Sequence, residues 1–305
     1  MTKNRWNRRE FIAAGAALST LPGATFATES SGMLTKVIPA TGEPLPVIGL
    51  GTYDVFDVES TAAEIATRKD ITQTLVKAGG SLLDTSPMYD RSEQVIGDVI
   101  TSGVDRGKLF LATKVWTDGR DAGIAQMNRS AELMTADVID LMQVHNLRDT
   151  AVHMKSIREL QEQGRIRYNG LTHYTANAHD ALAREMTEHE PQFIQINYSL
   201  GEREAENRVL PLAQDLGIAV LINRPYQAGR LFRFVSDKEL PDFARDFADS
   251  WGQFFLKFIV SHPAVTCVIP ATSKPHHMAD NLGAGFGNMP DAAMRKRMAE
   301  YFAGL

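Results

Sequence analysis

The segment SLLDTSPMYD (residues 81–90) ends a short aliphatic run with a carboxylate, Asp84, and places a phenol, Tyr89, shortly after it. Two later aliphatic runs, LFLATKVW and DLMQVHN, carry Lys114 and His145 near their ends. Helical patterns separate the runs. Parallel strands joined by helices bring their carboxyl ends together, so the pattern predicts an α/β barrel with these four polar side chains in one site.

Strand and helix patterns alternate along the chain after a short hairpin pattern formed by 35–38 and 45–48. The predicted strands are 48–52, 81–84, 109–115, 138–145, 167–173, 193–197, 219–223 and 266–270. The predicted helices are 62–78, 92–101, 122–135, 151–163, 178–189, 202–215, 247–261, 275–281 and 291–302.

This alternation favours an α/β fold, a (β/α)8 TIM barrel over residues 34–305 with an N-terminal β-hairpin and a C-terminal helical tail. The alternative is an open doubly wound sheet. That fold needs a Gly-x-Gly-x-x-Gly turn after its first strand, and Gly49-Leu50-Gly51 lacks the third glycine. We therefore interpret these glycines as a place where two backbones approach closely.

Composition excludes several classes of function. The net charge of −5 argues against a nucleic acid partner, because phosphate binding needs a basic surface. Cys267 is the only cysteine, so an intramolecular disulfide and a cysteine metal site are excluded, and we expect it to pack in the core. No metal-ligand spacing is present in the sequence, and we predict no metal site.

The first 27 residues differ from the rest of the chain. The pair Arg8-Arg9 precedes an apolar run over 11–21, and a cleavage site is expected after Ala27. The run is too short for a membrane span and resembles a twin-arginine export signal. It predicts recognition by the export machinery, a periplasmic or other extracytoplasmic location, and no membrane anchor after cleavage. The alternative is a basic disordered tail or a short amphipathic helix.

The four polar side chains are suited to proton transfer. A free tyrosine has a pKa near 10, and a nearby ammonium such as Lys114 stabilises the phenolate and lowers the pKa of Tyr89. Asp84 can keep Lys114 charged, and His145 can orient a carbonyl oxygen. Taken singly, each residue has a structural interpretation, such as a surface aromatic, a turn cap, an ion pair or a buried histidine. Their joint position on adjacent strand ends favours a site.

The chain resembles the aldo-keto reductase family over nearly all of its length after the export segment. The matching stretches are LPVIGLGTY, LLDTSPMYDRSEQVIG, LFLATKVW, DLMQVHN, IRYNGLTHY, FIQINYSL and VIPATSKPHHMADNLGAG. The resemblance implies reduction of an aldehyde or ketone with a nicotinamide dinucleotide, usually NADP, with NAD as the alternative. It implies that Tyr89 donates the proton, that Lys114 and Asp84 tune it, and that His145 orients the carbonyl.

The resemblance also implies a cofactor site. Thr172-His173 takes the place of the Ser-Asn pair that holds the nicotinamide amide together with Gln195, and Asn223 replaces the tyrosine that stacks on the ring. The family's basic positions near the 2′-phosphate align with Ala271 and His277, so Lys274 offers a substitute charge. The residues expected to contact the cofactor are Gly51, Thr52, Thr172, His173, Gln195, Asn223, Arg224, Thr272, Lys274, His277 and Asn281.

Three functions remain open from the sequence. The first is an exported carbonyl reductase acting on a small-molecule substrate. The second is a dinucleotide-binding sensor or partner subunit with little turnover, for which the replacement at Asn223 leaves room. The third is a barrel hydrolase or isomerase, but the sequence has no nucleophile elbow and no evident acid pair to support it.

Overall fold

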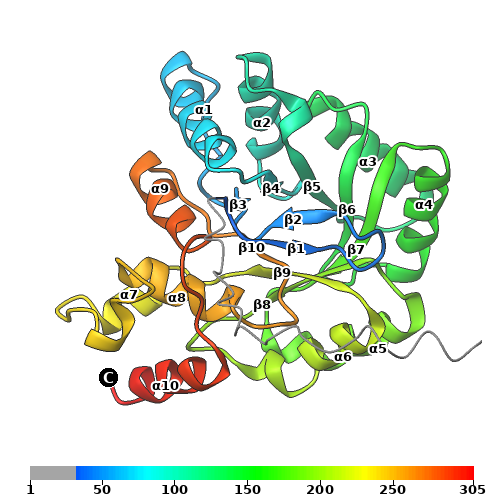
Figure 1. Cartoon of the computed structure of the whole chain (residues 1–305). Helices are drawn as coiled ribbons and strands as arrows, with labels where there is room; N and C mark the ends of the chain where they lie inside the picture. Colours follow the sequence, from blue (N-terminus) through cyan, green and yellow to red (C-terminus); the bar gives the residue numbers. More distant parts are fainter. Residues whose placement is uncertain (1–31) are drawn as a thin grey trace, which may run out of the picture.

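The computed structural model describes residues 32–305, and the predicted export segment 1–27 lies outside them. Within this range a ring of helices surrounds a barrel of parallel strands, as Figure 1 shows. The TIM barrel, its N-terminal hairpin and its C-terminal helix are therefore confirmed. No helix in the described part of the chain combines the length and apolar character needed to cross a membrane.

The strands are β1 Thr35–Val37, β2 Pro44–Pro46, β3 Leu50–Gly51, β4 Leu82–Asp84, β5 Phe110–Val115, β6 Ile139–His145, β7 Ile166–Thr172, β8 Phe193–Asn197, β9 Ala219–Asn223 and β10 Cys267–Val268. The α-helices are α1 Ala62–Lys77, α2 Ser92–Thr101, α3 Arg120–Leu133, α4 Thr150–Glu162, α5 His179–His189, α6 Val209–Leu216, α7 Arg230–Phe234, α8 Trp251–Val260, α9 Pro275–Gly283 and α10 Ala292–Ala303. Short 3₁₀ turns are η1 Arg106–Lys108, η2 Ala176–Ala178, η3 Glu204–Asn207 and η4 Asp242–Ala244.

The barrel strands follow one another in sequence order from β3 to β10, each parallel to its neighbour. The ring closes between β3 and β10 through the bridges Ile48–Val268 and Gly51–Ala271. A Cβ atom added at Gly51 would lie 2.8 Å from the backbone oxygen of Ile269, closer than real Cβ contacts. The predicted close backbone approach is therefore confirmed, and it is what lets the two short strands meet.

The apolar core has two layers. One fills the barrel interior, where the rings of Phe110, Tyr168 and Phe193 pack against one another near the amino ends of their strands. Ile38 and Leu45, next to or within the two hairpin strands, belong to this cluster, so the hairpin closes the amino-terminal end of the barrel. The second layer lies between strands and helices. Among residues 32–305, the hairpin thus covers one end of the barrel, and the loops that follow the strands surround the other, carboxyl-terminal end.

Three helical segments differ from the prediction. The helix predicted over 202–215 is instead the turn η3 followed by the shorter helix α6. The helix α6 begins two residues before Pro211. Proline lacks an N–H and fits only the first turn of a helix, which places the start of α6 near that residue. The loop after β9 contains α7, which the sequence did not predict. The helix predicted from residue 247 begins at Trp251, because Ser250 caps it by accepting from the Gln253 N–H.

Candidate active site

A buried ion pair joins the ends of β4 and β5. Lys114 Nζ lies 2.7 Å from Asp84 Oδ2 and donates to the backbone oxygen of Thr85 at 2.6 Å. The other carboxylate oxygen of Asp84 accepts from Gln195 Nε2 at 2.7 Å and from Gln143 Nε2 at 3.1 Å. Side-chain exposure is 1% for Lys114 and 3% for Asp84, so water does not share this pair.

The charge on Lys114 depends on Asp84. Burial alone would lower the pKa of Lys114, because a low-dielectric surrounding disfavours the ammonium. Asp84, the larger opposing influence, and Tyr89 together outweigh that cost, and the pKa of Lys114 lies above its ordinary value. The site therefore holds a fixed positive charge at neutral pH.

Tyr89 lies in the loop after β4, above this charge. Its ring centroid is 4.8 Å from Lys114 Nζ, and the Tyr53 ring meets it edge-on at 5.1 Å. Burial raises the pKa of Tyr89 above its ordinary value, and Lys114 opposes the shift only in part. Lys114 does lower the pKa of Tyr89, as predicted, but the net shift is upward, because burial of the phenolate, with the charge of Asp84, has the larger effect. The phenol is protonated at neutral pH, as a proton donor must be.

His145 ends β6 beside the phenol, with ring centroids 6.1 Å apart. Its Nδ1 lies 3.1 Å from Ser86 Oγ. Burial, reinforced by the positive charge of Lys114, lowers the pKa of His145 to about 3. The imidazole is therefore neutral across the physiological range, so it can donate a hydrogen bond but is no source of ionic charge.

These groups meet at a cavity of about 930 Å³, at the upper end of the usual size of ligand pockets. Asp84, Tyr89 and His145 line it, while Lys114 lies beneath them. Of the residues predicted from the sequence to contact a cofactor, the structure brings to this cavity Gly51, Thr52, Thr172, Gln195, Asn223, Arg224, His277 and Asn281. The predicted contacts His173, Thr272 and Lys274 do not line it.

The amide network under the cavity differs from what the resemblance implied. Gln195 was expected to hold the nicotinamide amide, yet its Nε2 donates to Asp84 and Gln143 and its Oε1 accepts from Thr172 and Asn223. The donors and acceptors of Gln195 are thus used within the protein. His173 Nδ1 accepts from the backbone N–H groups of Tyr174 and Thr175 in its own loop.

The aromatic groups of the cavity also differ from expectation. Tyr226, three residues after Asn223, donates its hydroxyl hydrogen to Asn281 Oδ1 at 2.7 Å and packs against Phe232. Tyr174, not singled out from the sequence, lines the cavity with 46% of its surface exposed. Its ring is parallel to His173 and 5.8 Å from the guanidinium of Arg224. An aromatic face is therefore available from the loop after β7.

The end of the cavity beside α9 carries little positive charge. Burial, with His276 and Lys274 nearby, lowers the pKa of His277, so this side chain is neutral at pH 7. Lys274 is exposed and precedes α9, where its N–H donates to Thr272 Oγ1. Asp280, also missed from the sequence, lines this end and accepts from Ser250 and Gln253. Arg224 is a cation of the cavity wall with no carboxylate partner among residues 32–305.

Sequence reasoning missed Gln143 and Ser86 as well. Gln143 lies two residues before His145 on a strand, so the two side chains share one face, and this period of two could have identified it. Ser86 follows Asp84 by the same spacing but lies beyond the end of β4, where the strand period no longer applies.

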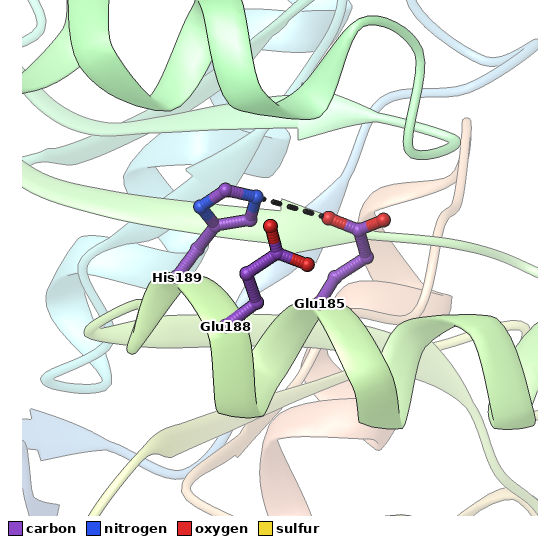
Figure 2. A group of neighbouring side chains, drawn as sticks. All are labelled: Glu185, Glu188 and His189. Atoms are coloured by element: carbon purple, nitrogen blue, oxygen red, sulfur yellow. Dashed lines mark ion pairs between the residues drawn. The ribbon is translucent and has the colours of Figure 1, made fainter.

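Among the residues that the structure describes, a group of side chains outside the cavity has the composition of a metal site. Glu185, Glu188 and His189 lie on one face of α5, with ligand atoms within 4.8 Å of one another, and His189 pairs with Glu185 at 3.2 Å (Figure 2). They are at the carboxyl end of α5, and helices of the barrel run back toward the amino ends of the strands. This cluster is therefore at the opposite end of the barrel from the cavity.

A barrel whose open end holds a lysine–carboxylate pair, a phenol and a neutral imidazole defines a class of oxidoreductase. The family model described as "Aldo/keto reductase family" matches residues 47–297. The chain belongs to this family and is an NAD(P)-dependent oxidoreductase.

Two similar curated proteins are named as reductases of small carbonyls. "Methylglyoxal reductase YeaE" from Escherichia coli is 28% identical over 80% of this chain and 87% of its own length. "Glyoxal reductase" from Bacillus subtilis is 24% identical over 79% of this chain and 83% of its own length. Among solved structures, an aldo-keto reductase from Klebsiella pneumoniae in complex with NADPH has a TM-score of 0.72 at 25% identity. That match covers 88% of this chain and 96% of the other.

We expect Asp84 and Lys114 to be strongly coupled in stability. Lys114→Met or Asp84→Asn alone leaves a buried uncompensated charge, which should lower the free energy of unfolding by about 3–5 kcal/mol. The double variant removes both charges and should be no less stable than either single variant. Urea unfolding of the wild type, the two single variants and the double variant gives the coupling energy. A stability loss in the double variant equal to the sum of the two single losses would contradict the predicted coupling. The exposed pair Arg208–Asp180 is the control, and its removal should leave the midpoint near that of wild type.

His145 should make the fold less stable as the pH falls. Its folded-state pKa of about 3 lies below the ordinary 6.5, so between these values the unfolded chain binds a proton that the folded chain does not. From pH 7 to about pH 5, wild type should lose about 2 kcal/mol more stability than His145→Asn. Denaturant unfolding at both pH values measures the difference. The exposed His276→Asn is the control, and an equal pH dependence in wild type and His145→Asn would contradict the assignment.

Proposed function

We propose that this protein reduces an aldehyde or ketone with a reduced nicotinamide dinucleotide, and that Tyr89 delivers the proton. The observation that carries the proposal is the buried Lys114–Asp84 pair under Tyr89, with neutral His145 beside it at one cavity. Proton donation in such a position contributes about 10²–10⁴-fold to the rate.

The four active-site residues have separate roles in the proposed reaction. His145 donates a hydrogen bond to the carbonyl oxygen and holds it near the phenol. Tyr89, protonated because its pKa is raised, gives its proton to that oxygen as negative charge develops there. Lys114 then stabilises the phenolate left behind, and Asp84 keeps Lys114 charged and directed. A bound nicotinamide dinucleotide would supply the hydride.

NADP is the proposed cofactor. The Klebsiella pneumoniae enzyme, whose structure was solved with NADPH, supports this choice, and the cavity of about 930 Å³ beside the four residues has room for a large ligand. Arg224 offers a guanidinium for the pyrophosphate. NAD is the alternative, because the neutral His277 and the uncharged Ala271 give a 2′-phosphate little attraction.

The proposed substrates are small reactive carbonyls. The named activities of the Escherichia coli and Bacillus subtilis relatives, on methylglyoxal and glyoxal, support this class. In this chain Tyr53 and Met88 line the cavity with much of their surface exposed, so an apolar edge of a substrate has a surface to contact.

A dinucleotide-binding sensor with little turnover is the second candidate. Asn223 favours it, because the amide replaces an aromatic ring and its Nδ2 is bonded to His173 O and Gln195 Oε1.

We also propose that the protein is exported by the twin-arginine machinery and acts in the periplasm. The support is Arg8-Arg9 before the apolar run in residues 11–21. The carbonyl reductase would then work outside the cytoplasm, where a cofactor loaded before export would supply the hydride for one turnover and further turnovers would need its re-reduction or exchange.

Tyr89→Phe tests the proton donor. Removing the hydroxyl should lower kcat for methylglyoxal by about 10²–10⁴-fold and leave NADPH affinity nearly unchanged. Absorbance loss at about 340 nm reports turnover and fluorescence titration reports binding. Tyr53→Phe removes a hydroxyl from the adjacent ring and is the control. Equal activity of Tyr89→Phe and wild type would contradict the role, and cofactor binding by wild type without turnover on any aldehyde or quinone would favour the sensor.

A reporter fusion tests export. Residues 1–30 fused to a reporter that is active only outside the cytoplasm should give signal, and Arg8→Lys with Arg9→Lys should abolish it while keeping the charge. Because the lysine pair keeps the positive charge, it distinguishes specific recognition of the two arginines by the export machinery from a general attraction to a basic segment. Reporter signal that persists in the lysine variant, or none from the native segment, would overturn the proposal.

A further inference from the structure

Ser86 contacts the active-site histidine directly. It lies between Asp84 and Tyr89 in the loop after β4 and has no exposed surface. Its Oγ is 3.1 Å from His145 Nδ1 and accepts from the Met88 N–H at 3.2 Å. No function described above uses this hydroxyl.

The number of hydrogens available at Ser86 Oγ determines which partner donates in the hydrogen bond between Ser86 and His145. A serine hydroxyl has one hydrogen to donate and lone pairs that accept. The Met88 N–H can only donate, so it occupies a lone pair and leaves the Ser86 hydrogen free. The acceptor within reach of that hydrogen among residues 32–305 is His145 Nδ1. If Nδ1 carried the proton instead, the buried Ser86 hydroxyl would receive two hydrogens and its own would have no acceptor, which is costly.

We propose that Ser86 is a positioning residue that fixes His145 as the tautomer with its proton on Nε2. This inference rests on the proposed carbonyl reduction and assigns a further residue to it. His145 lines the cavity, and its Nε2 has no hydrogen-bond partner within residues 32–305. The tautomer therefore determines whether Nε2 presents a hydrogen-bond donor or an acceptor to a substrate in the cavity.

The two tautomers act oppositely on a carbonyl. With the proton on Nε2, the ring donates to the carbonyl oxygen and favours the charge that develops there. With the proton on Nδ1, the lone pair of Nε2 would face that oxygen and repel it. Because burial, reinforced by the positive charge of Lys114, keeps the imidazole neutral, a second proton does not remove the difference.

Nitrogen NMR of the ¹⁵N-labelled wild-type protein at pH 7 tests the proposal without any turnover. The His145 signals are identified as those missing in His145→Asn. We expect Nε2 to be the protonated nitrogen and Nδ1 to be unprotonated. Protonation of Nδ1, or comparable amounts of the two tautomers, would overturn the proposal.

Ser86→Ala tests the cause. It should populate both tautomers and lower kcat for methylglyoxal by about 3–10-fold with a smaller change in KM, as expected for loss of one hydrogen bond. Ser86→Thr keeps the hydroxyl and should restore the wild-type NMR pattern. Ser92→Ala is the control, because Ser92 is equally buried but its hydroxyl has no partner within the described residues. An unchanged tautomer in Ser86→Ala would overturn the role of Ser86.

The two readouts separate this inference from the proposed function. If the NMR results are as expected but wild type reduces no carbonyl, the positioning role stands and the proposed function fails. If wild type turns over and Ser86→Ala changes neither tautomer nor kcat, the proposed function stands and the role of Ser86 fails.

Discussion

The site depends on the ion pair between Lys114 and Asp84. Two charges removed from water are costly unless each finds further partners, and here the partners come from several strands. Gln143 of β6 and Gln195 of β8 both donate to the carboxylate, while the Thr85 backbone accepts from the ammonium. The strands from β4 to β8 must therefore hold their register for the pair to be stable. The barrel must therefore form with the correct strand register for the charged pair of the active site to be stable.

Much of this could be predicted from the sequence. The alternation of strands and helices, and polar residues at strand ends, were enough for the barrel and for Asp84, Tyr89, Lys114 and His145 at one cavity. The reason is geometric, since parallel strands place their carboxyl ends together whatever fills the core. The family resemblance added the chemistry.

What could not be predicted depends on burial and on hydrogen-bond partners distant in sequence. The direction of the Tyr89 pKa follows from how much desolvation the loop imposes, and sequence spacing does not report desolvation. The use of Gln195 by Asp84 and Gln143 depends on three strands at once. The predicted helix boundaries were wrong near Pro211 and Ser250, where the backbone hydrogen bonding of one residue determined the start of the helix more strongly than the apolar periodicity did.

The hairpin that closes the amino-terminal end of the barrel has a practical consequence. Ile38 and Leu45 join the hairpin strands β1 and β2 to the interior cluster, so the start of the described chain is held on the side away from the cavity. An affinity tag, an immobilising linker or a fused carrier placed before residue 32 would attach at that side. The route by which ligands enter and leave would stay clear of it.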